Sequence, residues 1–153
     1  MSTRGFEFAY MFDGSDATPI VRDFVLHAAA AHKSGDLMVI DSDGELTQAT
    51  GTATEVAAVC QETVAAAAIT AGTTKAKMAI LTRNQVWRCS CDDTHTTWVV
   101  GYTKAGDITD CNTLDHDNVD HGPCCCVDNT ALLDDEGKQV NYVCFLDTTF
   151  GNT

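Results

Sequence analysis

The sequence predicts an all-β protein, a small β-barrel or sandwich of about seven short strands with an extended N-terminal arm. Short apolar or alternating runs are separated by turn signals rich in Gly, Asp and Asn, at spacings typical of such folds. The 153 residues suffice for one domain with a substantial core and are too few for two comfortable domains. We therefore expect an N-terminal arm over residues 1–33 and a β-barrel domain over residues 34–153.

The predicted arm is too apolar to be a simple solvated tail. Four aromatic residues alternate along its first part and predict a strand with one aromatic face. The run from Ile20 to His27 favours extended structure, whereas Ala28–Ala31 favour a short turn of helix. We expect the arm to dock on a neighbouring subunit and the aromatic face to make the intersubunit contacts; its members are Phe6, Phe8, Tyr10 and Phe12.

The segment from Gly35 to Ala49 reads as a self-contained hairpin. Leu37–Ile40 is an apolar strand, and Asp41–Gly44 is a turn whose glycine tolerates a positive φ angle. Glu45–Ala49 then returns with alternating polar and apolar residues. Nothing on or near this hairpin indicates chemistry, so we interpret it as a scaffold with a polar tip.

The alanine-rich segment from Ala53 to Ala68 fits either a four-turn helix with Thr54 as its N-cap or a strand. We favour a strand over Val56–Thr63, because valines and threonines interleave with small residues there. The next run, Lys75–Leu81, places two lysines on the face opposite Ala76 and Met78. That alternation predicts a half-exposed strand.

The remaining chain supplies four more predicted strands and one long loop. A reversal at Arg83–Gln85 joins Lys75–Leu81 to the following run in a second hairpin, and a turn at 134–138 precedes the last strand. The loop over Ile108–Gly122 is acidic and poor in apolar residues. The predicted strands are Val86–Cys89, Trp98–Tyr102, Cys124–Val127 and Gln139–Leu146.

The formal net charge of −13 disfavours nucleic acid and anionic membrane surfaces as partners. No apolar run approaches the ~20 residues that a membrane-spanning helix needs. The N-terminal residues also lack the basic start and uninterrupted apolar segment of a signal peptide. We expect protein partners only, and synthesis in a host cytoplasm.

Eight cysteines are then expected to stay reduced and to pack as small apolar side chains. On an extended strand, Cys124 and Cys126 face one way and Cys125 the other. The alternative is a zinc site, but the spacing lacks paired zinc knuckles, and no base stands beside a cysteine that could act as a nucleophile. The residues considered for zinc are Cys89, Cys91, His95, Cys111, His116, His121 and Cys124.

The acidic loop offers carboxylates for calcium at Asp115, Asp117 and Asp120, but the EF-hand pattern is absent and we expect a solvated loop. Phosphate-binding glycine loops, nucleophile elbows and HExxH motifs are also absent. We therefore assign no catalytic, cofactor-binding or metal-binding residue and expect no enzyme. An enzymatic site spread over loops, with His95, His116 and Asp92, stays open as an alternative.

The chain carries, in this order, the segments GDLMVIDSDGELTQAT, EVAAVCQETVAAAA, Ala71-Gly72 and KMAILTRNQVWRC. This order of segments resembles the small β-barrel capsid decoration, or cement, proteins of tailed bacteriophages. The resemblance covers residues 35–90. It implies a virion protein on the outer capsid surface that stabilises the shell by bridging capsomers. The implied partners are the major capsid protein and two further copies in a homotrimer. A head-fibre or tail component, or a Cys/His zinc-binding module, is the alternative; the cysteines and the long acidic loop depart from the family pattern.

Overall fold

Eleven antiparallel strands form three sheets in residues 5–150, which the computed structural model describes. The four-stranded sheet has the order β1 (Glu7–Met11), β7 (Gln85–Ser90), β11 (Gln139–Phe145) and β10 (Cys124–Leu133). The five-stranded sheet has the order β2 (Val21–Val25), β6 (Lys75–Ile80), β5 (Ala58–Cys60), β3 (Leu37–Ile40) and β4 (Leu46–Gln48). The third sheet pairs β8 (Ile108–Asp110) with β9 (Thr113–Leu114).

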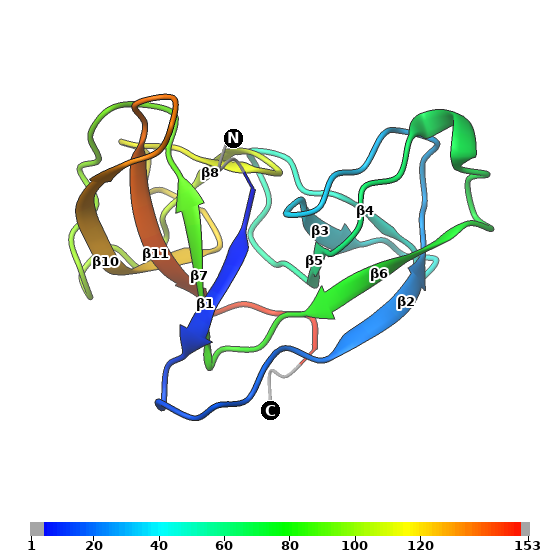
Figure 1. Ribbon diagram of the computed structural model, residues 1–153, viewed down its shortest axis with the longest axis horizontal. Helices are drawn as coiled ribbons and strands as arrows, with labels where there is room; N and C mark the ends of the chain where they lie inside the picture. The colour runs from blue at the N-terminus through cyan, green and yellow to red at the C-terminus, as the bar shows by residue number, and fades with distance from the viewer. Residues whose placement is uncertain (1–4, 151–153) are drawn as a thin grey trace.

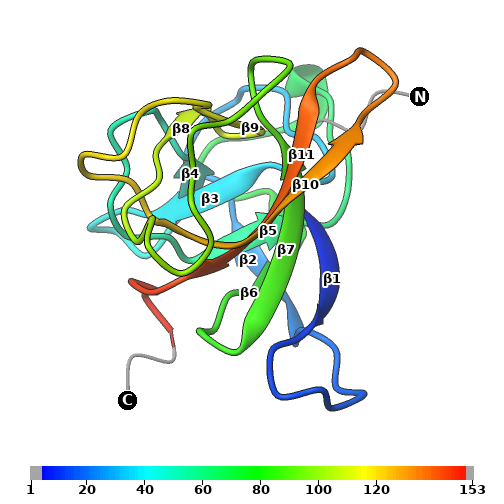
Figure 2. The same ribbon diagram turned by 90° about the vertical axis from the view of Figure 1, so that its left-hand side faces the viewer.

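The all-β prediction is confirmed, with more and shorter strands than expected and no closed barrel. The two large sheets lie on opposite sides of the molecule (Figure 1). A single short 3-10 helix in the described residues, η1 (Ala66–Ala68), lies beyond the far end of the five-stranded sheet. Turning the molecule brings the four-stranded sheet toward the viewer (Figure 2).

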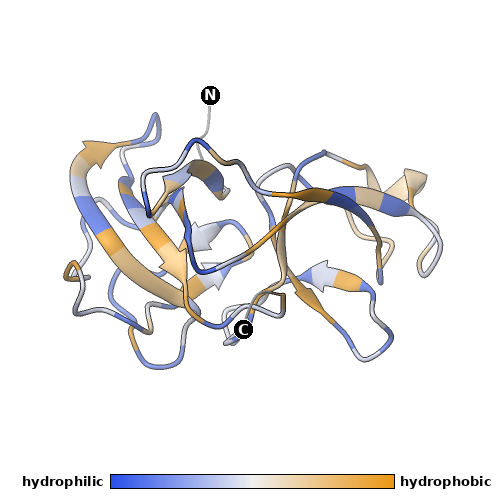
Figure 3. Cartoon of the chain, turned by 90° about the horizontal axis from the view of Figure 1, so that it is seen from below, coloured by the Kyte–Doolittle hydropathy of each residue, from blue (hydrophilic) through white to orange (hydrophobic). Residues whose placement is uncertain are grey.

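Both large sheets contribute to one hydrophobic core. Trp87 and Phe145 of the four-stranded sheet belong to the same buried cluster as Leu37 and Val59 of the five-stranded sheet. A second cluster, including Met38 and Met78, occupies the other face of the five-stranded sheet, because successive strand residues point to opposite faces. Hydrophobic residues accordingly gather in the strands, and hydrophilic residues mostly in the loops (Figure 3).

The hairpin predicted over residues 35–49 is confirmed. β3 pairs with β4 in the register Met38–Gln48, Val39–Thr47 and Ile40–Leu46. Gly44 has a φ of 79° in the connecting turn, a conformation that glycine adopts without steric cost. The local sequence signals therefore agree with the observed turn.

Further strand predictions are confirmed in whole or in part. Of the predicted strand Val56–Thr63, residues 58–60 form β5, a central strand buried on both faces, and no helix covers the alanine-rich segment apart from η1. β6 exposes both its lysines and buries Ala76 and Met78. β10 buries Cys124 and Cys126 and leaves Cys125 partly exposed, as the alternation predicts.

Three predictions between residues 81 and 122 are wrong. β6 and β7 do not form a hairpin, because the chain between them crosses from one large sheet to the other. Residues 98–102 form a turn rather than a strand: Thr103 N donates to Val99 O, which folds the backbone onto itself. The acidic loop is not wholly irregular, since it contains the short hairpin of β8 and β9.

Residues 5–33 supply one strand to each large sheet, so in its described part the predicted arm is not separate from the body. β1 pairs with β7, and β2 pairs with β6. Phe6 is buried against Phe145, with the ring centroids 5.5 Å apart, so it is unavailable for an intersubunit contact. The expected helical turn at residues 28–31 is also absent. Residues 1–4 and 151–153 of the predicted segments lie outside the described residues.

Within residues 5–150, no helix has the length and apolar character required to traverse a bilayer.

Candidate functional site

An apolar groove of about 370 Å³ lies where β10 and β11 meet the chain after β1. Phe12, Val100, Cys125, Cys144 and Leu146 are among its lining residues. Gly101 N donates to Cys126 O at 3.0 Å, which holds the turn at residues 99–102 against β10. Most of the surface that lines this groove is therefore hydrocarbon or thiol.

Large apolar side chains in the groove lining, and next to it in the sequence, are exposed to solvent. Of the lining residues, Phe12 is 62% and Val100 is 50% exposed; Val99 and Tyr102, which flank the lining residues Val100 and Gly101, are 55% and 86% exposed, and we call these four residues the rim. Exposed apolar groups that cluster around a concave surface are typical of an interaction site. Of the four aromatic residues predicted to make contacts, Tyr10 and Phe12 are exposed, whereas Phe6 and most of Phe8 are covered by the core.

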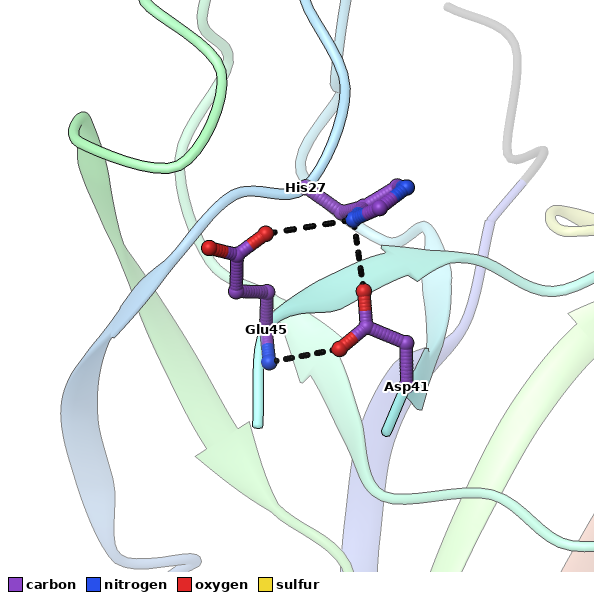
Figure 4. Close-up of side chains that lie close together, drawn as sticks. All are labelled: His27, Asp41 and Glu45. Carbon is purple, nitrogen blue, oxygen red and sulfur yellow. Dashed lines mark hydrogen bonds and ion pairs between the residues drawn. The ribbon is translucent and has the colours of Figure 1, made fainter. Parts of the chain in front are cut away.

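A second feature brings His27 onto the turn of the β3–β4 hairpin. The chain leaving β2 forms a single parallel bridge between Leu26 and Leu46, and His27 N donates to Leu46 O at 2.9 Å. This bridge connects the two edges of the five-stranded sheet at one point. It sets the half-exposed imidazole of His27 beside the carboxylates of Asp41 and Glu45, and we call these three residues the hairpin cluster (Figure 4).

Both carboxylates of the hairpin cluster lie next to the same imidazole nitrogen. His27 Nδ1 lies 2.6 Å from Asp41 Oδ2 and 3.1 Å from Glu45 Oε2. The other oxygen of Asp41, Oδ1, accepts backbone hydrogen bonds from Asp43 N and Glu45 N, and the bond from Glu45 lowers the pKa of this carboxyl. The backbone of the turn therefore fixes the Asp41 carboxylate with Oδ2 toward the imidazole (Figure 4).

A second histidine cluster lies beside β9, beyond the end of β7. Asp92 Oδ1 accepts hydrogen bonds from His116 Nδ1 at 2.7 Å and from His116 N at 2.9 Å. Asp92 Oδ2 accepts one from Thr109 Oγ1 at 2.9 Å. We call Asp92, Asp115 and His116 the loop cluster; their ligand atoms, like those of the hairpin cluster, lie within 4.8 Å of one another.

Electrostatics in the loop cluster favour a charged pair. The hydrogen bond to Asp92 raises the pKa of His116 above its ordinary value. Burial acts to raise the pKa of Asp92, but the hydrogen bonds from His116 and Thr109 outweigh it and lower that pKa. Burial raises the pKa of Asp115. His116 Nε2 also lies 3.5 Å from Asp93 and 3.6 Å from Asp117, so several carboxylates surround one imidazole.

The structure brings together some of the residues considered from sequence. His95 and His116 pack with their ring centroids 5.6 Å apart, and Asp92 binds His116, so the alternative enzymatic set is adjacent in space. Of the residues considered for calcium, Asp115 joins the loop cluster and Asp117 borders it, whereas Asp120 belongs to neither cluster. The sequence does not predict that His27, Asp41 and Glu45 meet, because their contact depends on the Leu26–Leu46 bridge and no spacing along the chain signals it.

The cysteines are packed in the fold rather than gathered as ligands. All eight are free, and six are buried. Burial raises the pKa of Cys126 to about 11 and the pKa of both Cys111 and Cys144 to about 12, and it also raises the pKa of Cys124 well above the ordinary value of a thiol. Such thiols stay protonated near neutral pH, and a protonated thiol is a poor nucleophile. Across residues 5–150, the two groups with converging ligand atoms contain no cysteine.

Comparisons of the chain with models of protein families, with curated proteins and with solved structures find no match.

Proposed function

We propose that the chain is a structural virion protein that binds the outer surface of a tailed-phage capsid and stabilises it by bridging capsomers. The observation that carries this proposal is the apolar groove with its exposed rim at Phe12 and Tyr102. Large exposed apolar side chains cost solubility in a monomer and are retained where they are covered in an assembly. We assign the groove to contacts between copies of the chain in a homotrimer.

Exposed sheet edges offer a second mode of assembly. β1 and β10 are the outer strands of the four-stranded sheet, and β2 and β4 those of the five-stranded sheet. Where no neighbour covers them, outer strands carry unpaired backbone groups that can pair with a strand of another protein. The bridges Leu26–Leu46 and Gly106–Cys124 already occupy part of β4 and the first part of β10. The major capsid protein is the partner that we assign to these edges, and three linked copies would bind it with an avidity that one copy lacks.

Charge supports a position outside the shell. A net charge of −13 repels the phosphates of packaged DNA and keeps the protein soluble before it assembles. The same features fit a head-fibre or tail component, which would differ in the part of the virion that it binds. In residues 5–150, neither group of converging ligand atoms contains a cysteine, which argues against the Cys/His zinc-binding module.

The test begins with sedimentation of the protein alone and with expanded, DNA-free capsids of the phage whose genome encodes it. We expect a trimer that co-sediments with the capsids. A monomer that never binds capsids would overturn the proposal. A trimer that binds isolated tails instead of capsids would support the alternative that the protein is a tail component.

Two double variants locate the contact. Phe12→Ser with Tyr102→Ser removes the apolar rim, so this protein should sediment as a monomer and bind capsids at least about tenfold more weakly. Leu132→Ser with Leu133→Ser is the matched control, because both leucines are exposed but lie at the other end of β10. Equal effects of the two double variants would contradict the assignment of the groove.

A further inference from the structure

The hairpin cluster has more acceptors than its one donor can serve. His27 Nδ1 makes its hydrogen bond with Glu45 Oε2. Asp41 Oδ2, although only 2.6 Å from the same nitrogen, is shielded from solvent and accepts no hydrogen bond. A shielded carboxylate oxygen without a donor is costly, because an anionic acceptor that has lost water needs a compensating positive group.

We propose that the hairpin cluster binds one divalent transition-metal ion of the zinc class through His27 Nδ1, Asp41 Oδ2 and Glu45 Oε2. One imidazole nitrogen and two carboxylate oxygens are ligands that Zn²⁺ takes in proteins. The two carboxylates also neutralise the charge of the ion, which supplies Asp41 Oδ2 with a permanent positive partner; its partner His27 is charged only when protonated.

The distances suit such an ion. Bonds of about 2.0–2.2 Å with tetrahedral angles separate neighbouring ligand atoms by about 3.4 Å. The two separations from Nδ1, 2.6 and 3.1 Å, are shorter, so the imidazole must move outward by less than about 1 Å. The side chain of His27 is 50% exposed, which leaves it free to rotate and leaves a coordination position open to water.

Neighbouring groups hold the carboxylates in place. Asp41 Oδ1 is occupied by the backbone N–H groups of Asp43 and Glu45, which orients the free oxygen as outer-shell hydrogen bonds orient metal ligands. Gly72 lies beside the Glu45 carboxylate, and a Cβ atom there would come within 3.2 Å of Oε1. The ion would therefore tie the tip of the hairpin to the chain that follows β2.

The loop cluster is the internal control, because it also contains one imidazole and two carboxylates but lacks the deficit of donors. Both oxygens of Asp92 already accept hydrogen bonds, two from His116 and one from Thr109. An ion would have to displace these bonds, so we expect the loop cluster to bind Zn²⁺ much more weakly than the hairpin cluster.

Calorimetric titration of the chelator-treated, full-length protein with ZnCl₂ tests the proposal. The wild type should bind one ion. His27→Ala and Asp41→Asn should each weaken binding by at least about tenfold, since each removes or discharges one of three ligands. His116→Ala is the matched control and should bind as the wild type does. Circular dichroism of the metal-free variants establishes that each one is folded.

Titration with Co²⁺ identifies the donor atoms by absorption. Nitrogen and oxygen ligands give visible d–d bands that His27→Ala removes, and this outcome supports the site. A thiolate charge-transfer band in the near ultraviolet would assign the ion to cysteine and overturn the proposal. So would unchanged Zn²⁺ binding in His27→Ala, loss of binding in His116→Ala, or no binding by the wild type.

Discussion

The hairpin cluster and the loop cluster contain the same chemical groups, but they differ in how many hydrogen bonds their aspartate oxygens accept. In each, an imidazole Nδ1 lies 2.6–2.7 Å from an aspartate oxygen. Asp92 in the loop cluster receives three hydrogen bonds, which occupy both its oxygens. Asp41 in the hairpin cluster receives backbone hydrogen bonds on Oδ1 and none on Oδ2.

The difference shows that residue composition alone does not decide whether a His–Asp group can take up a cation. What matters is how many donors the surrounding backbone and side chains direct at the carboxylate. The loop cluster is complete and should contribute to stability. The hairpin cluster is incomplete and should contribute to ion binding.

Replacing Asp92 and Asp41 by asparagine should give the largest difference in stability between the two clusters. Asp92→Asn removes the charge that pairs with His116 and turns one acceptor into a donor, so we expect a loss of about 2 kcal/mol in the free energy of unfolding. Asp41→Asn retains an acceptor for the backbone of the turn but discharges a carboxylate whose pKa the fold lowers. In metal-free protein we expect a smaller loss of stability than in Asp92→Asn, because Asp41 Oδ2 accepts no hydrogen bond.

Urea denaturation of both variants in the presence of chelator measures these values. Wild type at the same pH is the reference. If Asp41→Asn were as destabilising as Asp92→Asn, the two carboxylates would be equally satisfied, and the distinction between the clusters would be wrong.

Local signals explain what the sequence could predict of the hairpin. Apolar residues at 37–40, a turn ending in Gly44 and a short return strand specify one another within a few positions, and β3 and β4 form as predicted. The alternation in β6 is equally local. The presence of His27 at the turn could not be read in the same way, because the Leu26–Leu46 bridge joins residues twenty positions apart.

The wrong strand and hairpin predictions elsewhere also come from contacts between residues far apart in the sequence. The turn after β6 looks like a hairpin turn, but Leu81 is buried in the core shared by the two sheets, and the chain passes to the other sheet there. At Trp98 the apolar run suggested a strand, whereas the indole is buried and the next residues are exposed in a turn. For the loop cluster, the sequence indicated His95, His116 and Asp92 together but gave no means to count donors.

A second prediction concerns the stability and Zn²⁺ affinity of a variant at Gly44, in the turn of the β3–β4 hairpin. Gly44 has a positive φ of 79° with open space around it, so Gly44→Ala strains only the backbone and should cost about 1 kcal/mol. It should also weaken Zn²⁺ binding, because the turn positions both carboxylates. Gly137→Ala is the matched control, since its φ is 77° and it too faces open space, at the β10–β11 turn. Denaturation and calorimetry of both variants should show similar costs and different Zn²⁺ affinities.

The loop cluster should show a characteristic pH dependence. The folded state raises the pKa of His116 above 6.5, so the stabilisation is fully present below pH 6.5 and is lost as the pH rises through the raised value. His116→Gln should therefore cost more at pH 5.5 than at pH 8.5, by less than about 1 kcal/mol because the pair is partly solvated. Denaturation of wild type and variant across this range measures the difference. A cost that grows with pH would contradict the charged pair.

The smallest expected effect concerns the third donor to Asp92. Thr109→Val keeps the shape of the side chain and removes the hydroxyl that donates to Asp92 Oδ2, at a cost of about 0.5 kcal/mol because water can replace an exposed donor. Thr109→Ser, which keeps the hydroxyl, should cost less. In a double-mutant cycle the effect of Thr109→Val should shrink when residue 92 is already asparagine. Independent effects would mean that this donor does not strengthen the carboxylate, and the contrast with Asp41 would then rest on His116 alone.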